Sequence, residues 1–168
     1  MTSSANIHLR ALEPEDLELV YQIENDPLFW QYGAATVPYS RYALRQYIAS
    51  QQNDLFADGQ VRLVIEKDGT AVGFADLTNF DAVHLRAEIG LALLPDYQGQ
   101  HIGELAMQEL CSYARRLHVH QLYAIIATTN KAATRLFERL AFAPSATLKD
   151  WLRSDDGFTD AVVWQQTL

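Results

Sequence analysis

The sequence predicts a mixed α/β fold, an α+β arrangement in which helices flank a central, twisted and mostly antiparallel sheet. Runs with strand spacing and runs with helical spacing follow one another along the 168 residues in the order β-α-α-β-β-β-α-β-α-β-β. Asp68-Gly69 between two apolar runs is a strong signal for an antiparallel hairpin. Apolar residues make up 49% of the chain, as in ordinary globular domains. We therefore expect about seven strands and about four helices.

The first strand and helix are expected near the N-terminus. Ile7 and Leu9 alternate with polar residues, which is typical of a strand. A helix is expected to begin at Pro14, because proline and acidic residues are both favoured in a first helical turn. Asp26-Pro27 ends this helix.

The middle of the chain is expected to hold a second helix and three strands. Ser40 precedes a run with apolar residues on one helical face, so the helix begins there. Asp68-Gly69 separates the first two strands. The expected strands are 61–67, 70–78 and 86–94, and residues 51–60 are expected to form a loop.

The last third of the chain continues this alternation. Residues 102–117 carry apolar side chains at helical spacing. Asn130 is suited to cap a further helix over 131–140. The remaining β-rich runs predict strands at 121–128, 146–152 and 158–165.

Composition limits the classes of function. No linker-like segment divides residues 1–168, so we expect one domain. The 13 Lys and Arg residues against 21 Asp and Glu give a net charge of −8, which argues against a broad nucleic-acid or anionic-membrane surface and suits a cationic partner such as an amine. No apolar run approaches the roughly 18 residues of a membrane span, and no signal peptide is apparent. We expect a cytoplasmic protein with neither a membrane nor a nucleic acid as partner.

The segment 94–104 carries the chemistry. A strand ends there, a short loop follows, and a long amphipathic helix begins. The first amides of a helix lack internal partners and the helix dipole is positive there, so such an end binds phosphate. Gly99 and Gly103 let backbone amides approach an anion closely. The alternative is that these glycines only make a tight connection.

This segment is similar to the coenzyme A pyrophosphate loop of the GNAT acetyltransferase superfamily, with the pattern Gln/Arg-x-x-Gly-x-Gly/Ala. The resemblance extends from about residue 6 to residue 166 and implies the GNAT fold. It also implies acetyl transfer from acetyl-CoA to a primary amine. Within the superfamily, the chain looks closest to the ribosomal-protein N-terminal and spermidine acetyltransferases. Further segments that match the superfamily are 8–17, 86–91 and 130–142, and the closer resemblance lies in 84–88 together with 95–99.

The chain departs from the family pattern at three positions. His101 stands where glycine is usual; its side chain either restricts the backbone or adds charge toward the pyrophosphate. Phe137 replaces a tyrosine that protonates the leaving thiolate in many members, and Ala141 replaces a glycine. A thiol with a pKa of about 8.5 can leave as the thiolate, so the loss of a general acid slows the step and does not forbid it. Tyr97 or Tyr123 is a candidate substitute.

The resemblance implies which residues meet acetyl-CoA. The backbone amides of residues 98–104 hold the pyrophosphate. The end of the fourth strand, 91–94, forms a bulge whose amides meet the pantetheine arm and the thioester carbonyl, with Leu93 as the carbonyl donor. Asn130 approaches the coenzyme arm. The implied cofactor-binding residues are Leu91, Leu93, Leu94, Gln98, Gly99, Gln100, His101, Ile102, Gly103, Glu104, Asn130 and Phe137.

Glu88 is the expected general base. An amine arrives protonated, and Glu88 matches the family's fourth-strand glutamate, which acts through water. The alternative is an ordinary strand carboxylate, exposed or paired with Arg86. Asp76 on the neighbouring strand is the second choice. No ligand pattern indicates a metal ion, and none is expected.

The acceptor is expected to be a small amine or a polyamine, because the chain is acidic and resembles the spermidine group. Glu24 and Asp26 either attract a cationic acceptor or form a solvated helix end. A protein or peptide N-terminus is the alternative acceptor, and a catalytically weak acyl-CoA-binding module is the alternative function. A homo-oligomer follows from the resemblance only. Aromatic residues that either shape the acceptor pocket or pack in the core are Phe29, Trp30, Tyr32 and Tyr39.

Overall fold

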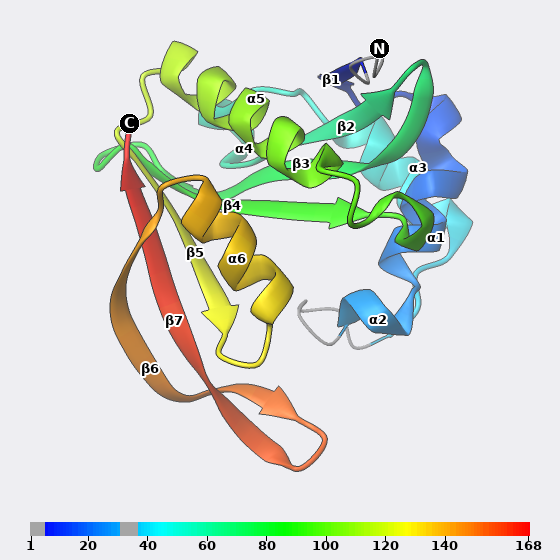
Figure 1. Ribbon diagram of the computed structural model, residues 1–168. Helices are drawn as coiled ribbons and strands as arrows, with labels where there is room; N and C mark the ends of the chain where they lie inside the picture. The colour runs from blue at the N-terminus through cyan, green and yellow to red at the C-terminus, as the bar shows by residue number, and fades with distance from the viewer. Residues whose placement is uncertain (1–5, 31–36) are drawn as a thin grey trace, which may run out of the picture.

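A seven-stranded sheet with the order β1-β2-β3-β4-β5-β7-β6 forms the centre of the protein (Figure 1). The computed structural model describes residues 6–30 and 37–168, with Trp30 described by its backbone alone. Neighbouring strands of this sheet are antiparallel, except β4 and β5, which are parallel. The mixed α/β fold predicted from the sequence is therefore confirmed. The strands are β1 (Ile7–Ala11), β2 (Val61–Lys67), β3 (Thr70–Asp81), β4 (Arg86–Leu93), β5 (Gln121–Ala127), β6 (Ala143–Ser154) and β7 (Gly157–Thr167).

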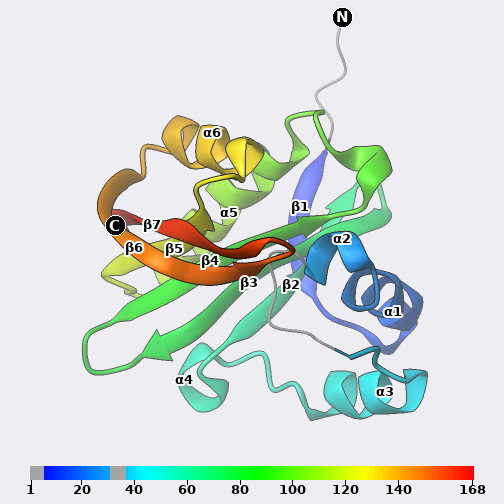
Figure 2. The same ribbon diagram turned by 90° about the horizontal axis from the view of Figure 1, so that it is seen from below.

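The helices cover both faces of the sheet. Figures 1 and 2 show α5 and α6 on one face and α1, α2 and α3 on the other. The described helices are α1 (Leu17–Glu24), α2 (Pro27–Trp30), α3 (Arg41–Ser50), α4 (Leu55–Asp58), α5 (Ile102–Arg116) and α6 (Lys131–Arg139), with 3-10 turns η1 (Pro14–Asp16) and η2 (Pro95–Tyr97).

Two short helices were not expected. The expected loop over 51–60 contains α4, so that prediction is wrong for four residues. Asp54 caps α4, with its side chain accepting hydrogen bonds from the N–H groups of Phe56 and Ala57, and Gly59 ends it with a φ of 68°. The helix α2 follows Asp26 directly, where the first helix was expected to end. Helices of one turn carry no measurable apolar periodicity, which explains both omissions.

The local capping and turn signals are confirmed. Asp68 and Gly69 have φ values of 50° and 82°, as the primed hairpin turn between β2 and β3 requires. The Ser40 side chain accepts a hydrogen bond from Ala43 N at 3.1 Å at the start of α3. Asn130 Oδ1 accepts one from Ala133 N at 3.1 Å at the start of α6.

Side chains of β2, β3 and β4 alternate between two hydrophobic clusters. On β4, Ala87 and Ile89 are buried in the cluster that includes α5 residues such as Met107. The side chain of Glu88 therefore points to the opposite face, the one covered by α1 and α3. The cluster on that face contains buried residues of α1, α3 and the sheet, among them Val20, Leu44 and Phe74.

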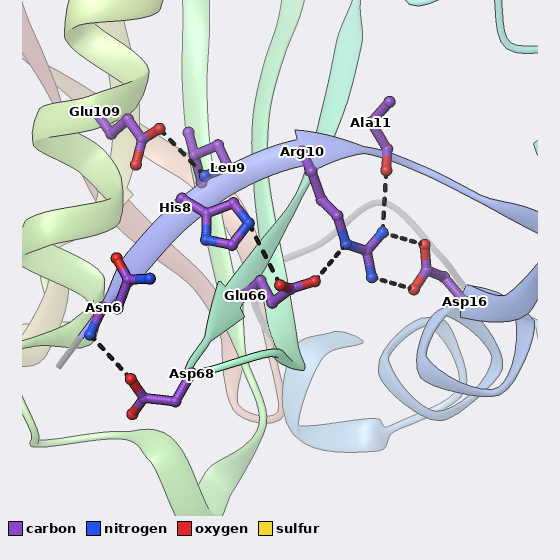
Figure 3. A network of polar contacts seen from close by, with 9 residues as sticks. All are labelled: Asn6, His8, Leu9, Arg10, Ala11, Asp16, Glu66, Asp68 and Glu109. Atoms are coloured by element: carbon purple, nitrogen blue, oxygen red, sulfur yellow. Dashed lines mark hydrogen bonds and ion pairs between the residues drawn. The ribbon is translucent and has the colours of Figure 1, made fainter.

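A polar network fixes β1 against its neighbours (Figure 3). Both guanidinium Nη atoms of Arg10 donate to the Asp16 carboxylate, at 2.8 and 2.9 Å, and Arg10 Nε donates to Glu66 at 2.6 Å. Asp16 also accepts from Glu13 N at 2.9 Å. Burial raises the pKa of the Asp16 carboxyl, but the hydrogen bonds from Arg10 and Glu13 outweigh it and leave this pKa lowered.

Across residues 6–30 and 37–168, none of the helices combines the length and apolar character that crossing a membrane demands.

Candidate active site

The parallel strands β4 and β5 pair only at their beginnings. Their register runs from Arg86 opposite Gln121 to Glu88 opposite Tyr123, and then the strands diverge (Figure 1). β5 continues along β7 to Ala127. The β5-facing edge of β4 beyond Glu88 therefore has no strand partner among the described residues, and its backbone groups are available to another molecule.

Leu91 and Leu93 direct their backbone groups toward this diverging side. Leu94 N donates to Val72 O of β3 at 2.9 Å. Because backbone groups of successive strand residues point to opposite edges, those of Leu93 and Leu91 point away from β3. Leu93 O confirms this direction, since it accepts a hydrogen bond from Gln98 Nε2 at 3.0 Å.

The bulge expected at 91–94 is absent. The register with β3 is regular from Glu88, opposite Thr78, to Leu93, opposite Gly73. The irregularity lies instead between Thr78 and Asp81. The orientation of the Leu91 and Leu93 amides thus comes from regular strand alternation together with the divergence of β5.

The loop after β4 ends in a helix N-terminus. Gly99 takes a φ of 71°, and Gln100 Nε2 braces the loop by donating to Asp96 O at 2.7 Å. The backbone N–H groups of residues 99–104 make no hydrogen bond to any part of the chain that the structure describes. These amides meet the positive end of the 15-residue helix α5. The arrangement suits a phosphate group.

His101 adopts the conformation that glycine would take. Its φ is 61°, in the left-handed region, which costs a non-glycine residue about 1–2 kcal/mol. The side chain therefore does not prevent the loop conformation. It is 78% exposed and lies 3.5 Å from Glu104 Oε2, which also accepts from Arg139 Nε of α6 at 3.0 Å. Arg139 first, and His101 next, lower the pKa of Glu104.

Gly103 brings the first turn of α5 against the end of β4. A Cβ at this position would lie 2.9 Å from Leu91 Cδ2 and 3.5 Å from Leu93 Cδ1. The glycine therefore allows the free amides of the loop and those of Leu91 and Leu93 to lie close together.

Glu88 has a hydrogen-bond partner that the sequence did not reveal. Asn79 Nδ2 donates to Glu88 Oε2 at 2.7 Å. The alternative pairing of Glu88 with Arg86 is wrong, because Arg86 pairs with Asp81 at 3.0 Å. Burial and the charge of Glu88 both raise the pKa of Tyr123, its register partner on β5.

Asp76, the second-choice base, is engaged by Arg62. The guanidinium contacts both carboxylate oxygens, Nε at 3.0 Å from Oδ1 and Nη2 at 2.8 Å from Oδ2. Arg62 also bonds Glu24 of α1. Asp76 and Glu24, two carboxylates considered for the site, thus both pair with the partly buried Arg62 between the sheet and α1.

Comparison with known proteins identifies the family. The sequence pattern of the acetyltransferase (GNAT) domain matches residues 6–143. The chain belongs to the GNAT acetyltransferase family. It is an N-acetyltransferase that uses acetyl-CoA as co-substrate.

The similar proteins include acetyltransferases that act on spermidine and on a ribosomal protein. The acetyltransferase is 28% identical over 144 residues to spermidine N(1)-acetyltransferase of Escherichia coli K12, covering 85% of this chain and 76% of that protein. It is 26% identical over 157 residues to the ribosomal protein bS18-alanine N-acetyltransferase of the same organism, covering 92% and 93%. Spermidine N-acetyltransferase from Vibrio cholerae, solved with CoA and spermine, superposes with a TM-score of 0.83 at 22% identity, covering 96% and 95%.

Two of the residues implied to contact acetyl-CoA have other partners in the acetyltransferase. Asn130 Oδ1 caps α6. Phe137 is 5% exposed and packs edge-on against Phe142, with ring centroids 4.8 Å apart. Their roles toward the coenzyme stay predictions.

The aromatic residues proposed for the acceptor pocket differ in their surroundings. Phe29 packs against the cluster of α1 and α3, whereas Tyr39 is exposed. Tyr32 and the side chain of Trp30 lie outside the described residues. Among the residues that are described, no three His, Cys, Asp or Glu side chains gather as metal ligands would.

Proposed function

We propose that the acetyltransferase moves the acetyl group of acetyl-CoA to a primary amine of a polyamine or another small amine. The observation that carries the proposal is the position of Glu88 at the last paired position before β4 and β5 diverge, on the same strand as Leu91 and Leu93. The relationship to spermidine N(1)-acetyltransferase and the net charge of −8 support a cationic acceptor.

The roles follow from the needs of the reaction. Glu88 accepts a proton from the ammonium group through a water molecule, and the freed nitrogen attacks the thioester carbonyl. The N–H of Leu93 donates to the oxygen that becomes negative in the transition state. The thiolate leaves without a dedicated acid, since the pKa of the thiol is about 8.5, and it takes up the proton that the nitrogen loses as the amide forms. Residues that we assign to coenzyme binding are Leu91, Leu93, Leu94, Asn130, Phe137 and those from Gln98 to Glu104.

Thiol release from acetyl-CoA, measured against a panel of acceptors, tests this proposal. The panel holds spermidine, spermine, diamines, monoamines and peptides with an N-terminal alanine. We expect turnover with polyamines. Turnover with peptides alone would transfer the assignment to the alternative acceptor, which the 26% identity to the bS18-alanine enzyme favours.

Silence across the panel, together with a rise in melting temperature on adding coenzyme A, would support the acyl-CoA-binding module instead.

The role of Glu88 is tested separately with Glu88→Gln. We expect kcat to fall by about 10²–10⁴-fold, the usual contribution of general acid–base catalysis, with the largest loss at low pH, where more of the amine is protonated. The melting-temperature rise with coenzyme A should stay unchanged. An unaltered pH–rate profile would remove Glu88 from the base role.

We also propose that residues 1–168 form one domain that works in the cytoplasm without a nucleic-acid or membrane partner. A homologue from Vibrio cholerae is described as dodecameric, and this supports a homo-oligomer. Light scattering of the purified protein distinguishes an oligomer from a monomer of 19.0 kDa.

A further inference from the structure

Asn79 lies in a β-bulge directly beside Glu88. Thr78 is opposite Glu88 and Asp81 is opposite Arg86, so β3 has one residue more than β4 between these pairs. Asn79 within this stretch takes a φ of 49°. Bulges of this kind redirect a side chain and occur frequently next to active sites.

The bulge turns the Asn79 side chain toward the carboxylate on the neighbouring strand. Its Nδ2 lies 2.7 Å from Glu88 Oε2, the short distance typical of a hydrogen bond to a charged group. Glycine, asparagine and aspartate are the residues that tolerate a left-handed conformation readily. Of these three, only asparagine has a side-chain donor. The positive φ and the hydrogen bond to Glu88 at position 79 are thus both met by asparagine.

The other neighbours of Glu88 leave it available as a proton acceptor. Arg86, two residues away on the same face of β4, is engaged by Asp81. Tyr123 is the register partner on β5, and burial followed by the charge of Glu88 raises its pKa. Its hydroxyl therefore stays neutral at physiological pH. Glu88 has an amide donor from β3 and a neutral phenol on the β5 side.

We propose that Asn79 is a positioning residue for acetyl transfer, which orients the Glu88 carboxylate toward the acceptor nitrogen at the divergence of β4 and β5. This inference rests on the proposed role of Glu88 as the base. A hydrogen bond restricts the carboxylate to one orientation, and the rate of proton transfer depends on that orientation.

The variant Asn79→Gly tests the inference, because glycine accepts the positive φ and removes only the side chain. We expect kcat to fall about 10- to 100-fold, as for the loss of one hydrogen bond to a charged group. KM for acetyl-CoA should be unchanged, since the coenzyme loop is elsewhere. The matched control is Asn53→Gly, because Asn53 has a similar φ of 56° and its buried Oδ1 has no hydrogen-bond partner within 6–30 and 37–168. The control should retain its kcat.

Two further variants separate positioning from a structural role. Asn79→Asp keeps the shape and tolerates the same φ but cannot donate, so kcat should fall at least as far as in Asn79→Gly. In a Glu88→Gln background, Asn79→Gly should cause no further loss, because the carboxylate it positions is gone. Losses that multiply in the double variant would overturn the inference.

The outcomes distinguish the positioning role of Asn79 from the base role of Glu88 on which it rests. If Glu88→Gln is as active as the wild type, the base role fails and the positioning role fails with it. If Glu88→Gln is impaired while Asn79→Gly and Asn79→Asp keep the wild-type kcat, only the positioning role is refuted.

Discussion

The turn after α6 contains Ala141, where removal of a single methyl group tests how backbone conformation affects stability. Ala141 N donates to Glu138 O at 3.1 Å, and Phe142 N donates to Phe137 O at 3.0 Å. These two bonds, with the contact between the Phe137 and Phe142 rings, define a Schellman motif. The motif requires a left-handed residue at Ala141, whose φ is 62°. Glycine is the residue that this position usually carries.

The substitution Ala141→Gly should stabilise the protein. A non-glycine residue in the left-handed region costs about 1–2 kcal/mol, and the extra freedom of glycine in the unfolded chain costs about 0.5–1 kcal/mol. Ala141 is exposed, so its methyl group contributes little packing. The difference predicts a gain of about 0.5–1 kcal/mol in the free energy of unfolding. For a chain of this length, the melting temperature should rise by about 1–4 °C.

Thermal and urea unfolding of the purified variants measure this effect. The control is Ala49→Gly, at an exposed position within α3, which should lose roughly 0.5–1 kcal/mol because glycine is unfavourable in a helix. Opposite signs for the two substitutions would confirm that backbone conformation decides the effect. A loss of stability in Ala141→Gly equal to that in Ala49→Gly would refute the reasoning.

Further predictions concern a buried carboxylate and a core ring. Asp16→Asn should lower the free energy of unfolding at pH 7 by about 2–3 kcal/mol, because it removes one of the two ion pairs of the partly buried Arg10 and leaves only the pair with Glu66. The folded-state pKa of Asp16 is lowered, so its contribution is present above the unfolded pKa of about 3.9. It is lost as the pH falls through the folded value, and urea titrations from pH 7 to pH 3 should show the variant and wild type converging. Phe137→Tyr should lower the free energy of unfolding by roughly 1–3 kcal/mol, because a hydroxyl enters a buried site. Its kcat should not rise. A ten-fold increase in kcat would show instead that the reaction lacked an acid at this position.

Local signals in the sequence predicted much of the fold. Asp68-Gly69, Ser40 and Asn130 each act on a turn or cap within a few residues, so their effects are visible in one stretch of chain. The seven strands followed from apolar runs between such signals. The one-turn helices α2 and α4 were missed because four residues contain too little periodicity.

The candidate site was predictable only in part. The glycine spacing located the loop at the start of α5, because that loop is continuous in sequence. The contact between Asn79 and Glu88 depends on a bulge in the register of two strands, which the order of residues does not reveal. The engagement of Asp76 by Arg62 likewise depends on which residues of β2 and β3 lie opposite each other.

The two edges of the sheet differ in how open they are to another chain. On β1, Leu9 N donates to Glu109 Oε1 of α5 at 3.2 Å (Figure 3), so a side chain already occupies an outward-facing donor of a strand only five residues long. On the opposite edge, β6 runs for 12 residues, and most of its side chains are exposed. The Glu109 side chain thus occupies a backbone donor of the β1 edge that a further strand would otherwise use. The β6 edge is thus the longer of the two templates for strand pairing with another chain.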